Sequence, residues 1–377
     1  MPRRHVSVYT MTAQVDPAEA GAENRGASPR SGAPAPARAG ALPRRLLGRT
    51  GIEVTTLGFG GAPLGDLYAL LDDAVAIATV EAAHDAGIGL FDTAPLYGRG
   101  LSEHRIGTAL RRRPRASFVL STKVGRLYAP APHGVERAEG YVGGFPFEGR
   151  FDYSYDGAMR SLEHSLLRLG TASIDLALVH AVDAWTHGEQ EVEARIGEAQ
   201  RGACRAHADL RDQGVIRAFG IGVNDAAVCA RFVRETDIDC VLLAGRYSLL
   251  EQPAQDEFLP LAAERGIGVL LGGVFNSGIL ATGAVAGARY NYRPATAEVI
   301  ARVAAIERTC TAHGVGLAHA ALAFALAHPA VTSLVLGAVS PLEVARNLAA
   351  FAAPVPGGLW RDLVAAGLLR ADLPLPE

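Results

Sequence analysis

The segment FDTAPLYGRGLSEHRIG (91–107) gives the strongest indication of the fold class. An apolar run ends at Asp92, and Tyr97 follows shortly after it. The pattern recurs downstream, where Lys123 lies near the end of FVLSTKVG (118–125) and His180 ends IDLALVH (174–180). A carboxylate, a phenol, an ammonium and an imidazole therefore each lie at or just past the end of a predicted buried strand.

The whole chain alternates short apolar runs with longer amphipathic stretches. Each run is rich in Leu or β-branched residues and stops at Gly, Asn, Asp or Pro, which predicts a buried parallel strand. The eight runs are VTTLGFGGAPLG (54–65), GIGLFDTA (87–94), SFVLSTKVG (117–125), IDLALVHAVD (174–183), IRAFGIGVN (216–224), CVLLAGRYSLL (240–250), GIGVLLGGVFNSG (266–278) and VTSLVLGAV (331–339). Helical spacing predicts helices over residues 72–87 and 155–170, closed by Gly87 and Gly170.

Alternating strands and helices predict a parallel sheet, either an open doubly wound sheet or a closed barrel. An open sheet that binds a dinucleotide needs a G-x-G-x-x-G turn after its first strand. The glycines at 58, 60, 61 and 65 do not have this spacing, and Pro63 interrupts them. We therefore expect an α/β fold, a (β/α)8 TIM barrel over residues 44–377, whose strand ends converge on one catalytic face.

Composition limits the other function classes. The 36 Lys and Arg residues nearly balance the 39 Asp and Glu residues, so neither a nucleic-acid partner nor a membrane surface is expected. Four scattered cysteines (Cys204, Cys229, Cys240 and Cys310) indicate free thiols of a reducing, cytoplasmic location and no metal site. Residues 1–43 are rich in Ala, Gly, Pro, Ser and Arg and lack apolar periodicity, which predicts a disordered extension without a signal peptide.

The contexts FDTAPLYG, STKVG and LALVHAVD of Asp92, Tyr97, Lys123 and His180 resemble the aldo/keto reductase superfamily, from about Leu46 to the C-terminus. The resemblance implies a TIM barrel that binds a nicotinamide dinucleotide without the Rossmann glycines. The stretches GGVFNSGILATG (272–283), ARYNYRPA (288–295) and PGGLWRDLVAAGLL (356–369) resemble the branch of L-fucose or D-threo-aldose 1-dehydrogenases and pyridoxal 4-dehydrogenase.

The four side chains suit hydride transfer, which needs a group that moves a proton on the substrate oxygen. Tyr97 is the expected acid/base, provided that an adjacent cation, Lys123, lowers its pKa from about 10. Asp92 would pair with Lys123, and His180 would orient the substrate oxygen. Taken singly, Asp92 could be a helix cap, Lys123 a solvated strand end and His180 a core residue; their joint occurrence at three strand ends favours a site.

The resemblance also implies cofactor contacts. Tyr247 would stack on the nicotinamide, although it could instead be a core tyrosine, and Phe275, Ser277 and Gly278 would follow the pyrophosphate. Gly337, Glu343 and Asn347 would hold the adenosine end. The Ser-Asn pair that the family has after its fifth strand is replaced here by Gly222 and Val223, which leaves Asn224 as the expected partner of the nicotinamide carboxamide. The Gln that the family has in its sixth strand is replaced by Ala244.

Gly337 and Glu343 occupy the positions of the basic residues that bind the 2′-phosphate of NADPH, so NAD is expected in preference to NADP. Arg346 is near enough in sequence to weaken this preference. The long segment 126–155 is expected to form a flap over a small polar ligand or a surface excursion. Trp185 is expected either to stack on a sugar ring or to pack against the loop.

These features predict an NAD(P)-dependent enzyme that oxidises the anomeric carbon of an aldose to a lactone. The alternative enzyme is a pyridoxal 4-dehydrogenase, because pyridoxal is itself a cyclic hemiacetal. An alternative of another class is a regulatory subunit that binds the cofactor without turnover. A small sugar or pyridoxal-like substrate is the expected partner, and the oligomeric state is left open.

Overall fold

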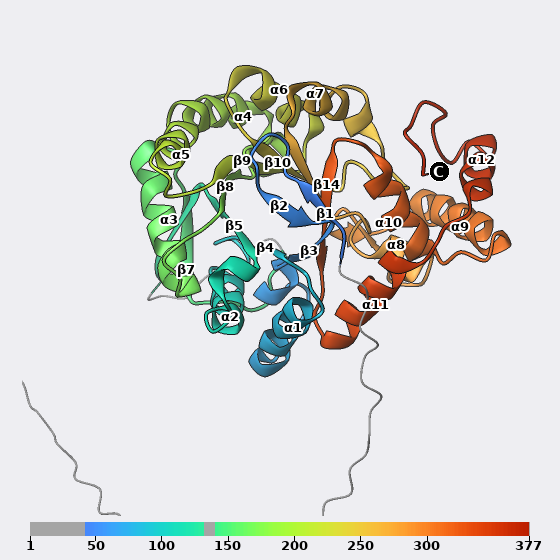
Figure 1. Cartoon of the computed structure of the whole chain (residues 1–377), viewed down its shortest axis with the longest axis horizontal. Coiled ribbons are helices and arrows are strands. Elements are labelled where there is room, and N and C mark those ends of the chain that lie inside the picture. Colours follow the sequence, from blue (N-terminus) through green and yellow to red (C-terminus); the bar gives the residue numbers. More distant parts are fainter. Residues whose placement is uncertain (1–41, 132–139, 377) are drawn as a thin grey trace, which may run out of the picture. The chain divides into compact units, whose positions relative to one another are not determined.

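A closed barrel of parallel strands forms the centre of the structure (Figure 1), a computed structural model that describes residues 42–131 and 140–376. The strand order around the barrel is β3–β4–β5–β8–β9–β10–β11–β14, closing back on β3. The bounds are β3 Leu57–Gly60, β4 Leu90–Asp92, β5 Val119–Val124, β8 Leu176–His180, β9 Ala218–Val223, β10 Cys240–Ala244, β11 Gly268–Gly272 and β14 Val331–Gly337. Each strand lies within one of the eight runs, so the predicted TIM barrel is confirmed.

Helices surround the barrel. They are α1 Asp73–Asp85, α2 Leu101–Leu110, α3 Tyr155–Leu169, α4 Ala184–Arg201, α5 Ala203–Asp212, α6 Ala226–Glu235, α7 Phe258–Arg265, α8 Ile279–Thr282, α9 Ala297–Ala312, α10 Leu317–Ala327, α11 Pro341–Ala352 and α12 Gly357–Ala365. Both predicted helices are confirmed. The Asp72 side chain caps α1 by accepting from two backbone N–H groups, and α3 ends at Gly170, whose φ of 60° is left-handed.

An antiparallel hairpin, β1 Arg44–Leu46 and β2 Glu53–Thr55, lies across the centre of the ring of strands (Figure 1). Its apolar residues Leu47, Ile52 and Val54 form one buried cluster with the first residues of several barrel strands, including Leu90 and Leu176. The hairpin therefore closes the amino-terminal end of the barrel. The opposite end, where the strands finish, is left for a binding site.

The sequence did not predict this hairpin. The first run was expected to be one strand, but the structure divides it into β2 and β3 at Thr56, whose backbone N–H donates to the carbonyl of Pro43 at 2.9 Å. Pro43 thus contacts the barrel, although it was assigned to the N-terminal extension. Leu42, also assigned to that extension, packs against the core, and residues 1–41 lie outside the described residues.

Two further hairpins follow the carboxyl ends of strands. The first joins β6 Arg126–Pro130 to β7 Phe147–Phe151, and the second joins β12 Arg289–Tyr290 to β13 Arg293–Pro294. The first lies in the segment expected to form a flap, of which residues 132–139 are not described. Arg99 holds this segment by donating to the carbonyls of Phe145 and Gly143 at 2.5 and 2.7 Å.

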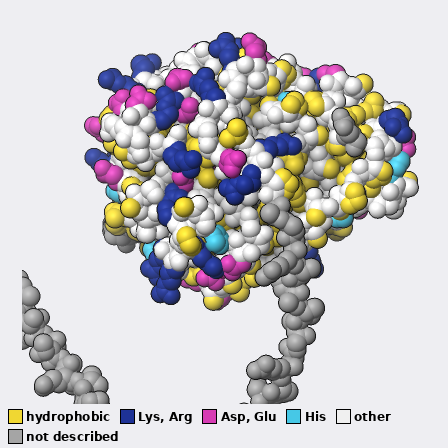
Figure 2. Space-filling view, viewed as in Figure 1, with side chains coloured by type: hydrophobic (Ala, Val, Ile, Leu, Met, Phe, Trp, Pro, Cys, Tyr) yellow, Lys and Arg dark blue, Asp and Glu magenta, His cyan; other side chains and the backbone are white. Residues whose placement is uncertain are grey.

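The surface agrees with the balanced composition. Basic and acidic side chains are interspersed over the face seen in Figure 2. Within the described ranges, no single helix is long and apolar enough to cross a membrane; α9 and α10 pass that test only as a pair, which is bent by 95°.

Candidate active site

Asp92 and Lys123 form a buried ion pair on neighbouring strands. Asp92 is the last residue of β4, and Lys123 lies near the end of β5. Lys123 Nζ donates to Asp92 Oδ2 at 2.6 Å and to the carbonyl of Thr93 at 2.8 Å, while Ser121 Oγ donates to Asp92 Oδ1 at 2.8 Å. The two residues are 3% and 1% exposed, so neither a helix cap nor a solvated strand end describes them.

Tyr97 and His180 lie beside this pair. Tyr97 belongs to the turn between β4 and α2, and Lys123 Nζ is 4.9 Å from the centroid of its ring. The His180 ring meets the Tyr97 ring edge-on, with 5.8 Å between centroids. The structure therefore brings all four predicted residues into one cluster at the carboxyl ends of β4, β5 and β8.

The pKa of Tyr97 differs from the expectation. Burial raises it to about 12, and the neighbouring Asp92 carboxylate adds to the increase, although Lys123 acts in the opposite direction. The prediction that this pKa falls below its ordinary value is therefore wrong. Lys123 limits the increase, but the loss of water around the phenol dominates.

Lys123 and His180 differ in charge: the first is charged and the second is neutral. Burial lowers the pKa of Lys123, but Asp92 and Tyr97 outweigh burial, so the net shift is upward and the ammonium stays charged. Burial, together with the charges of Lys123 and Arg126, lowers the pKa of His180 well below 6.5. The imidazole is therefore neutral near pH 7 and carries one N–H donor and one acceptor nitrogen.

The cluster opens into a cavity of about 400 Å³. Tyr97, Lys123 and His180 line it together with the predicted Trp185, which is 52% exposed. Other lining residues were not predicted individually; among them are Arg126, Tyr141, Asp183, Tyr292 and Arg293. A cavity with aromatic walls and a few charged groups is the usual form of a small-molecule site.

The flap segment contributes to this cavity, as expected for a ligand cover. Tyr141 is 7% exposed and stacks on Tyr97 with 6.2 Å between ring centroids. Across the cavity, Asn291 and Tyr292 form the tip of the second hairpin, both in left-handed conformations with φ of 47° and 64°. A two-residue hairpin turn commonly has a positive φ at both central residues, and the aromatic ARYNYRPA stretch was the only sequence signal for this one.

At residue 222, where the family pattern has a serine, the chain lies against Lys123. A Cβ at Gly222 would lie 3.2 Å from Lys123 Cε, so a serine there would crowd the lysine. Asn224 lines the cavity as expected, and its backbone N–H donates to Asp183 Oδ2 at 3.1 Å. Ala244, at the end of β10, also lines the cavity.

Tyr247 is not at the site, which corrects the expected stacking role. The residue is 1% exposed, and its ring stacks on Phe324 at 5.1 Å and meets His328 edge-on at 5.4 Å. It is absent from the described residues that line the cavity. Its alternative assignment as a core tyrosine is therefore the one that the structure supports.

The remaining predicted cofactor residues lie on loops that follow neighbouring strands of the barrel. Ser277 and Gly278, after β11, are partly buried with left-handed φ of 60° and 100°, and the Gly278 N–H donates to the carbonyl of Phe275 at 3.0 Å. Phe275 packs partly against the core. Because β9, β10, β11 and β14 are adjacent, these segments follow one another along the rim of the barrel.

At the far end of this rim, the predicted residues Gly337, Glu343 and Asn347 make hydrogen bonds around the start of α11. Asn347 Nδ2 donates to the carbonyl of Gly337 at 3.3 Å, and Glu343 Oε2 accepts from the backbone N–H of Val339 at 2.9 Å. Ser340 Oγ in turn accepts from the Glu343 N–H at 3.2 Å. Glu343 is thus part of a capping arrangement, a structural role that its carboxylate has in addition to any contact with a ribose.

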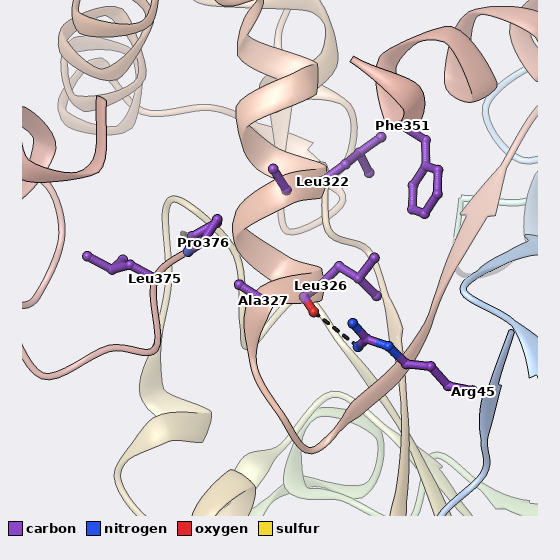
Figure 3. Close-up of a pocket in the computed structure, with 8 residues that line it drawn as sticks. Arg45, Leu322, Leu326, Ala327, Phe351, Leu375 and Pro376 are labelled. Atoms are coloured by element: carbon purple, nitrogen blue, oxygen red, sulfur yellow. Dashed lines mark hydrogen bonds between the residues drawn. The ribbon is translucent and has the colours of Figure 1, made fainter. Parts of the chain in front are cut away.

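Another pocket lies between α10, α11 and the C-terminal segment (Figure 3). Its lining is largely apolar and includes Leu322, Leu326 and Phe351. Among the described lining residues the charged one is Arg45, which donates to the carbonyl of Leu326 at 3.2 Å. None of the predicted site residues lines it. Three of the four predicted catalytic residues, Tyr97, Lys123 and His180, line the cavity at the barrel mouth instead.

Comparisons with known proteins agree with this geometry. The model of the Aldo/keto reductase family matches residues 56–363. A pyridoxal 4-dehydrogenase of Microbacterium luteolum is 44% identical over 86% of this chain and 98% of its own length. A D-threo-aldose 1-dehydrogenase of a Pseudomonas species is 38% identical over 85% of this chain and 96% of its own length.

A solved structure supports the same assignment. The holo form of an aldo-keto reductase from Bacillus halodurans has a TM-score of 0.67 and 26% identity, covering 88% of this chain and 98% of that chain. Aldo/keto reductases are oxidoreductases that use NAD(P)(H), and this chain belongs to that family.

Proposed function

We propose that the protein oxidises the hemiacetal carbon of a small cyclic substrate to a lactone, with NAD as its preferred cofactor. The observation that carries this proposal is the Lys123 ammonium, which bonds to the buried Asp92 carboxylate and lies beside the Tyr97 ring. His180 lines the same cavity. An acid/base, a fixed cation and a neutral hydrogen-bond donor then surround one substrate oxygen.

In the oxidative direction Tyr97 accepts the proton of the hemiacetal hydroxyl as the carbon–oxygen bond becomes a carbonyl. When bound, the nicotinamide supplies the acceptor for the hydride that leaves the same carbon. The neutral His180 imidazole donates its N–H to the substrate oxygen and orients it. Lys123 stabilises the phenolate form of Tyr97, and Asp92 keeps Lys123 in place.

The pKa of about 12 for Tyr97 determines how the two directions respond to pH. At neutral pH the phenol is protonated, so Tyr97 can donate its proton when a carbonyl is reduced. Oxidation requires the phenolate, whose fraction increases as pH rises toward this pKa. The forward reaction is therefore favoured at alkaline pH.

Pyridoxal is the substrate that the cavity supports best, which reverses the order expected from the sequence alone. Tyr141, Trp185 and Tyr292 offer flat apolar faces to an aromatic ring, and the guanidinium groups of Arg126 and Arg293 suit its phenolic oxygen. The 44% identity to a pyridoxal 4-dehydrogenase supports the same choice.

An aldose is the second candidate. The 38% identity to a D-threo-aldose 1-dehydrogenase favours it. Against it, the cavity carboxylate of Asp183 already accepts backbone N–H groups from Thr186 at 3.0 Å and Asn224 at 3.1 Å, which leaves it less capacity for sugar hydroxyls. A regulatory subunit without turnover is not supported, because both relatives are named dehydrogenases.

The preference for NAD is supported by the residues around α11. Glu343 places a carboxylate at this end of the rim, where a 2′-phosphate would be repelled. A Cβ at Gly337 would lie 2.6 Å from Pro63 Cγ, so a longer basic side chain does not fit there without movement of Pro63. The four buried, unpaired cysteines support the further proposal of a cytoplasmic location.

A substrate panel tests the proposed function. Pyridoxal, L-fucose and other aldoses are offered with NAD or NADP, and reduction of the cofactor is followed by absorbance. We expect turnover of pyridoxal with NAD to exceed that of every aldose. Turnover confined to open-chain alcohols, or cofactor binding without any turnover, would contradict the proposal.

A further inference from the structure

Tyr153 is a buried tyrosine that the mechanism above does not use. It lies between β7 and α3 and is 0% exposed. Its hydroxyl lies 2.9 Å from the carbonyl oxygen of His180 and 3.2 Å from that of Ala181. Tyr153 does not itself line the catalytic cavity among the described residues, so any effect on the reaction must act through other residues.

The hydroxyl also contacts His187 Nε2, at 2.9 Å. A phenol has only one proton to donate, and burial raises the pKa of Tyr153, so that proton stays in place. Burial, with Arg195 and Arg126, lowers the pKa of His187, so its ring is neutral near pH 7. If Tyr153 donates to His180, His187 must carry its proton on Nε2 and donate to the phenol oxygen.

The backbone at this contact is in an unusual conformation. Ala181 has a φ of 54°, a left-handed conformation that is unfavourable for a residue with a Cβ. The chain turns immediately after His180. The Ala181 N–H donates to the carbonyl of Gly222 at 2.9 Å, and the single Tyr153 O–H proton is shared between the carbonyls of His180 and Ala181, the nearer of which is that of His180. Residues in such conformations persist where the surroundings over-determine them.

The same tyrosine touches the strand that carries Lys123. Gly125 follows Lys123 by two residues, and its φ is 111°. A Cβ at Gly125 would clash with the Tyr153 ring, and Asp152 N–H donates to the Gly125 carbonyl at 3.0 Å. The ring and the hydroxyl of Tyr153 therefore connect the ends of β5 and β8, one beside Lys123 and the other at His180.

We propose that Tyr153 is a positioning residue for hydride transfer, whose hydroxyl fixes the backbone at His180 and Ala181 and thereby aims the His180 imidazole at the substrate oxygen. The inference rests on the proposed function, because it assigns His180 to that oxygen. Loss of the hydroxyl leaves the packing against Gly125 intact but releases the turn after His180. The hydroxyl contacts His180, Ala181 and His187, none of which is predicted to hold the dinucleotide, so the binding of the dinucleotide should be unaffected.

The test compares Tyr153→Phe with Tyr155→Phe. The control removes a hydroxyl that donates to Asp209 Oδ2 at 3.0 Å, outside the cavity, so it also loses one hydrogen bond. We expect Tyr153→Phe to lower kcat about tenfold or more, with the KM for substrate and the Kd for NADH within about twofold of the wild type. Tyr155→Phe should leave all three unchanged. Wild-type kcat in Tyr153→Phe would overturn the proposal.

A double-mutant cycle distinguishes positioning of His180 from a general structural effect. If Tyr153 acts through His180, Tyr153→Phe should have no further effect, within about twofold, in a His180→Gln background. If the losses multiply instead, the proposal is wrong. The cycle can be run with any substrate that the wild type oxidises, whichever hemiacetal that is.

A measurement without substrate separates this proposal from the proposed function. The imidazole resonance of His180, assigned by its loss in His180→Gln, is followed against pH by NMR. In Tyr153→Phe we expect His180 to titrate closer to 6.5 because its ring is less confined, whereas in Tyr155→Phe it should titrate as in the wild type. An unchanged titration in Tyr153→Phe would contradict the positioning role even if no substrate were known.

A rescue variant covers the case in which Tyr153→Phe does not fold. Para-aminophenylalanine at position 153 keeps a donor at the same place on the ring. We expect it to retain at least about half of the wild-type kcat, since the carbonyls of His180 and Ala181 keep a partner. A folded protein of this kind with kcat as low as that of His180→Gln would overturn the proposal.

Discussion

Lys123 Nζ lies 2.6 Å from Asp92 Oδ2, and both side chains are almost completely withdrawn from solvent. In this buried pair, the attraction between the two opposite charges compensates each group for the loss of its hydration. Removing one partner leaves the other as an isolated buried charge. The relationship therefore couples the stability of the barrel mouth to the proton transfer proposed for Tyr97.

Asp92→Asn should lower the free energy of unfolding by about 3 kcal/mol, because the Lys123 ammonium then lacks its counter-charge. The matched control is Asp85→Asn, which breaks the exposed Arg113–Asp85 pair of 2.8 Å and should cost less than about 1 kcal/mol. Urea denaturation measures both. If the free energy of unfolding fell equally in the two variants, burial of the Asp92 pair would not increase its contribution to stability.

Tyr97→Phe keeps the ring but removes the group that moves the proton. We expect kcat to fall by at least about 10²-fold, the usual effect of losing a general acid/base, while the Kd for NADH changes little. Steady-state kinetics and fluorescence titration give the two values. Near-normal turnover in this variant would mean that Tyr97 is not the acid/base.

The raised pKa of Tyr97 predicts opposite pH dependences for the two directions. Below about 12 the phenolate fraction rises tenfold for each pH unit, so kcat/KM for oxidation should rise with pH from 7 to about 10. Reduction uses the phenol and should be flat over the same range. Initial rates in both directions test this, and an oxidative rate that is independent of pH would be inconsistent with it.

Lys123→Met should move the oxidative profile to higher pH by at least about one unit, because the cation that stabilises the phenolate is lost. The reductive rate at neutral pH should be affected less than the oxidative rate. An unchanged profile would exclude Lys123 from control of the Tyr97 pKa.

The sequence was sufficient to predict the barrel and the four-residue cluster, for related physical reasons. A parallel strand buried on both faces is a continuous apolar run, so all eight were recognisable, from Leu57–Gly60 to Val331–Gly337. Once a barrel was expected, Asp92, Lys123 and His180 had to meet, because strand ends share one face. Gly87 and Gly170 marked the ends of two helices in the same way.

Other features had no such local signal. The β1–β2 hairpin has only short strands, and the turn at Asn291 and Tyr292 uses left-handed residues without the glycine that usually marks it. Tyr247 was placed by its position in a family pattern, which does not say that its ring packs against Phe324. The pKa of Tyr97 was misjudged because the sequence names its charged neighbours but not its burial.

For the cofactor, we expect NAD to exceed NADP by at least about tenfold in kcat/KM, equivalent to about 1.4 kcal/mol. Glu343→Gln should reduce this ratio, since it removes the charge but keeps an oxygen that can accept from the Val339 N–H. Glu343→Arg should shift the ratio further toward NADP, with some loss of stability because the cap is lost. A kcat/KM for NADP equal to or higher than that for NAD in the wild type would contradict the prediction, and it would implicate Arg346 as the ligand of the 2′-phosphate.

The most direct measurement of the central claim follows deuterium placed on the hemiacetal carbon of pyridoxal. With NAD and the wild-type protein, mass spectrometry should find the lactone as the first product and the deuterium in the reduced cofactor, in equal amounts, and Tyr97→Phe should form neither at a comparable rate. If the deuterium appears in solvent, or if the cofactor is reduced without formation of a lactone, the account of hemiacetal oxidation at Tyr97 is contradicted.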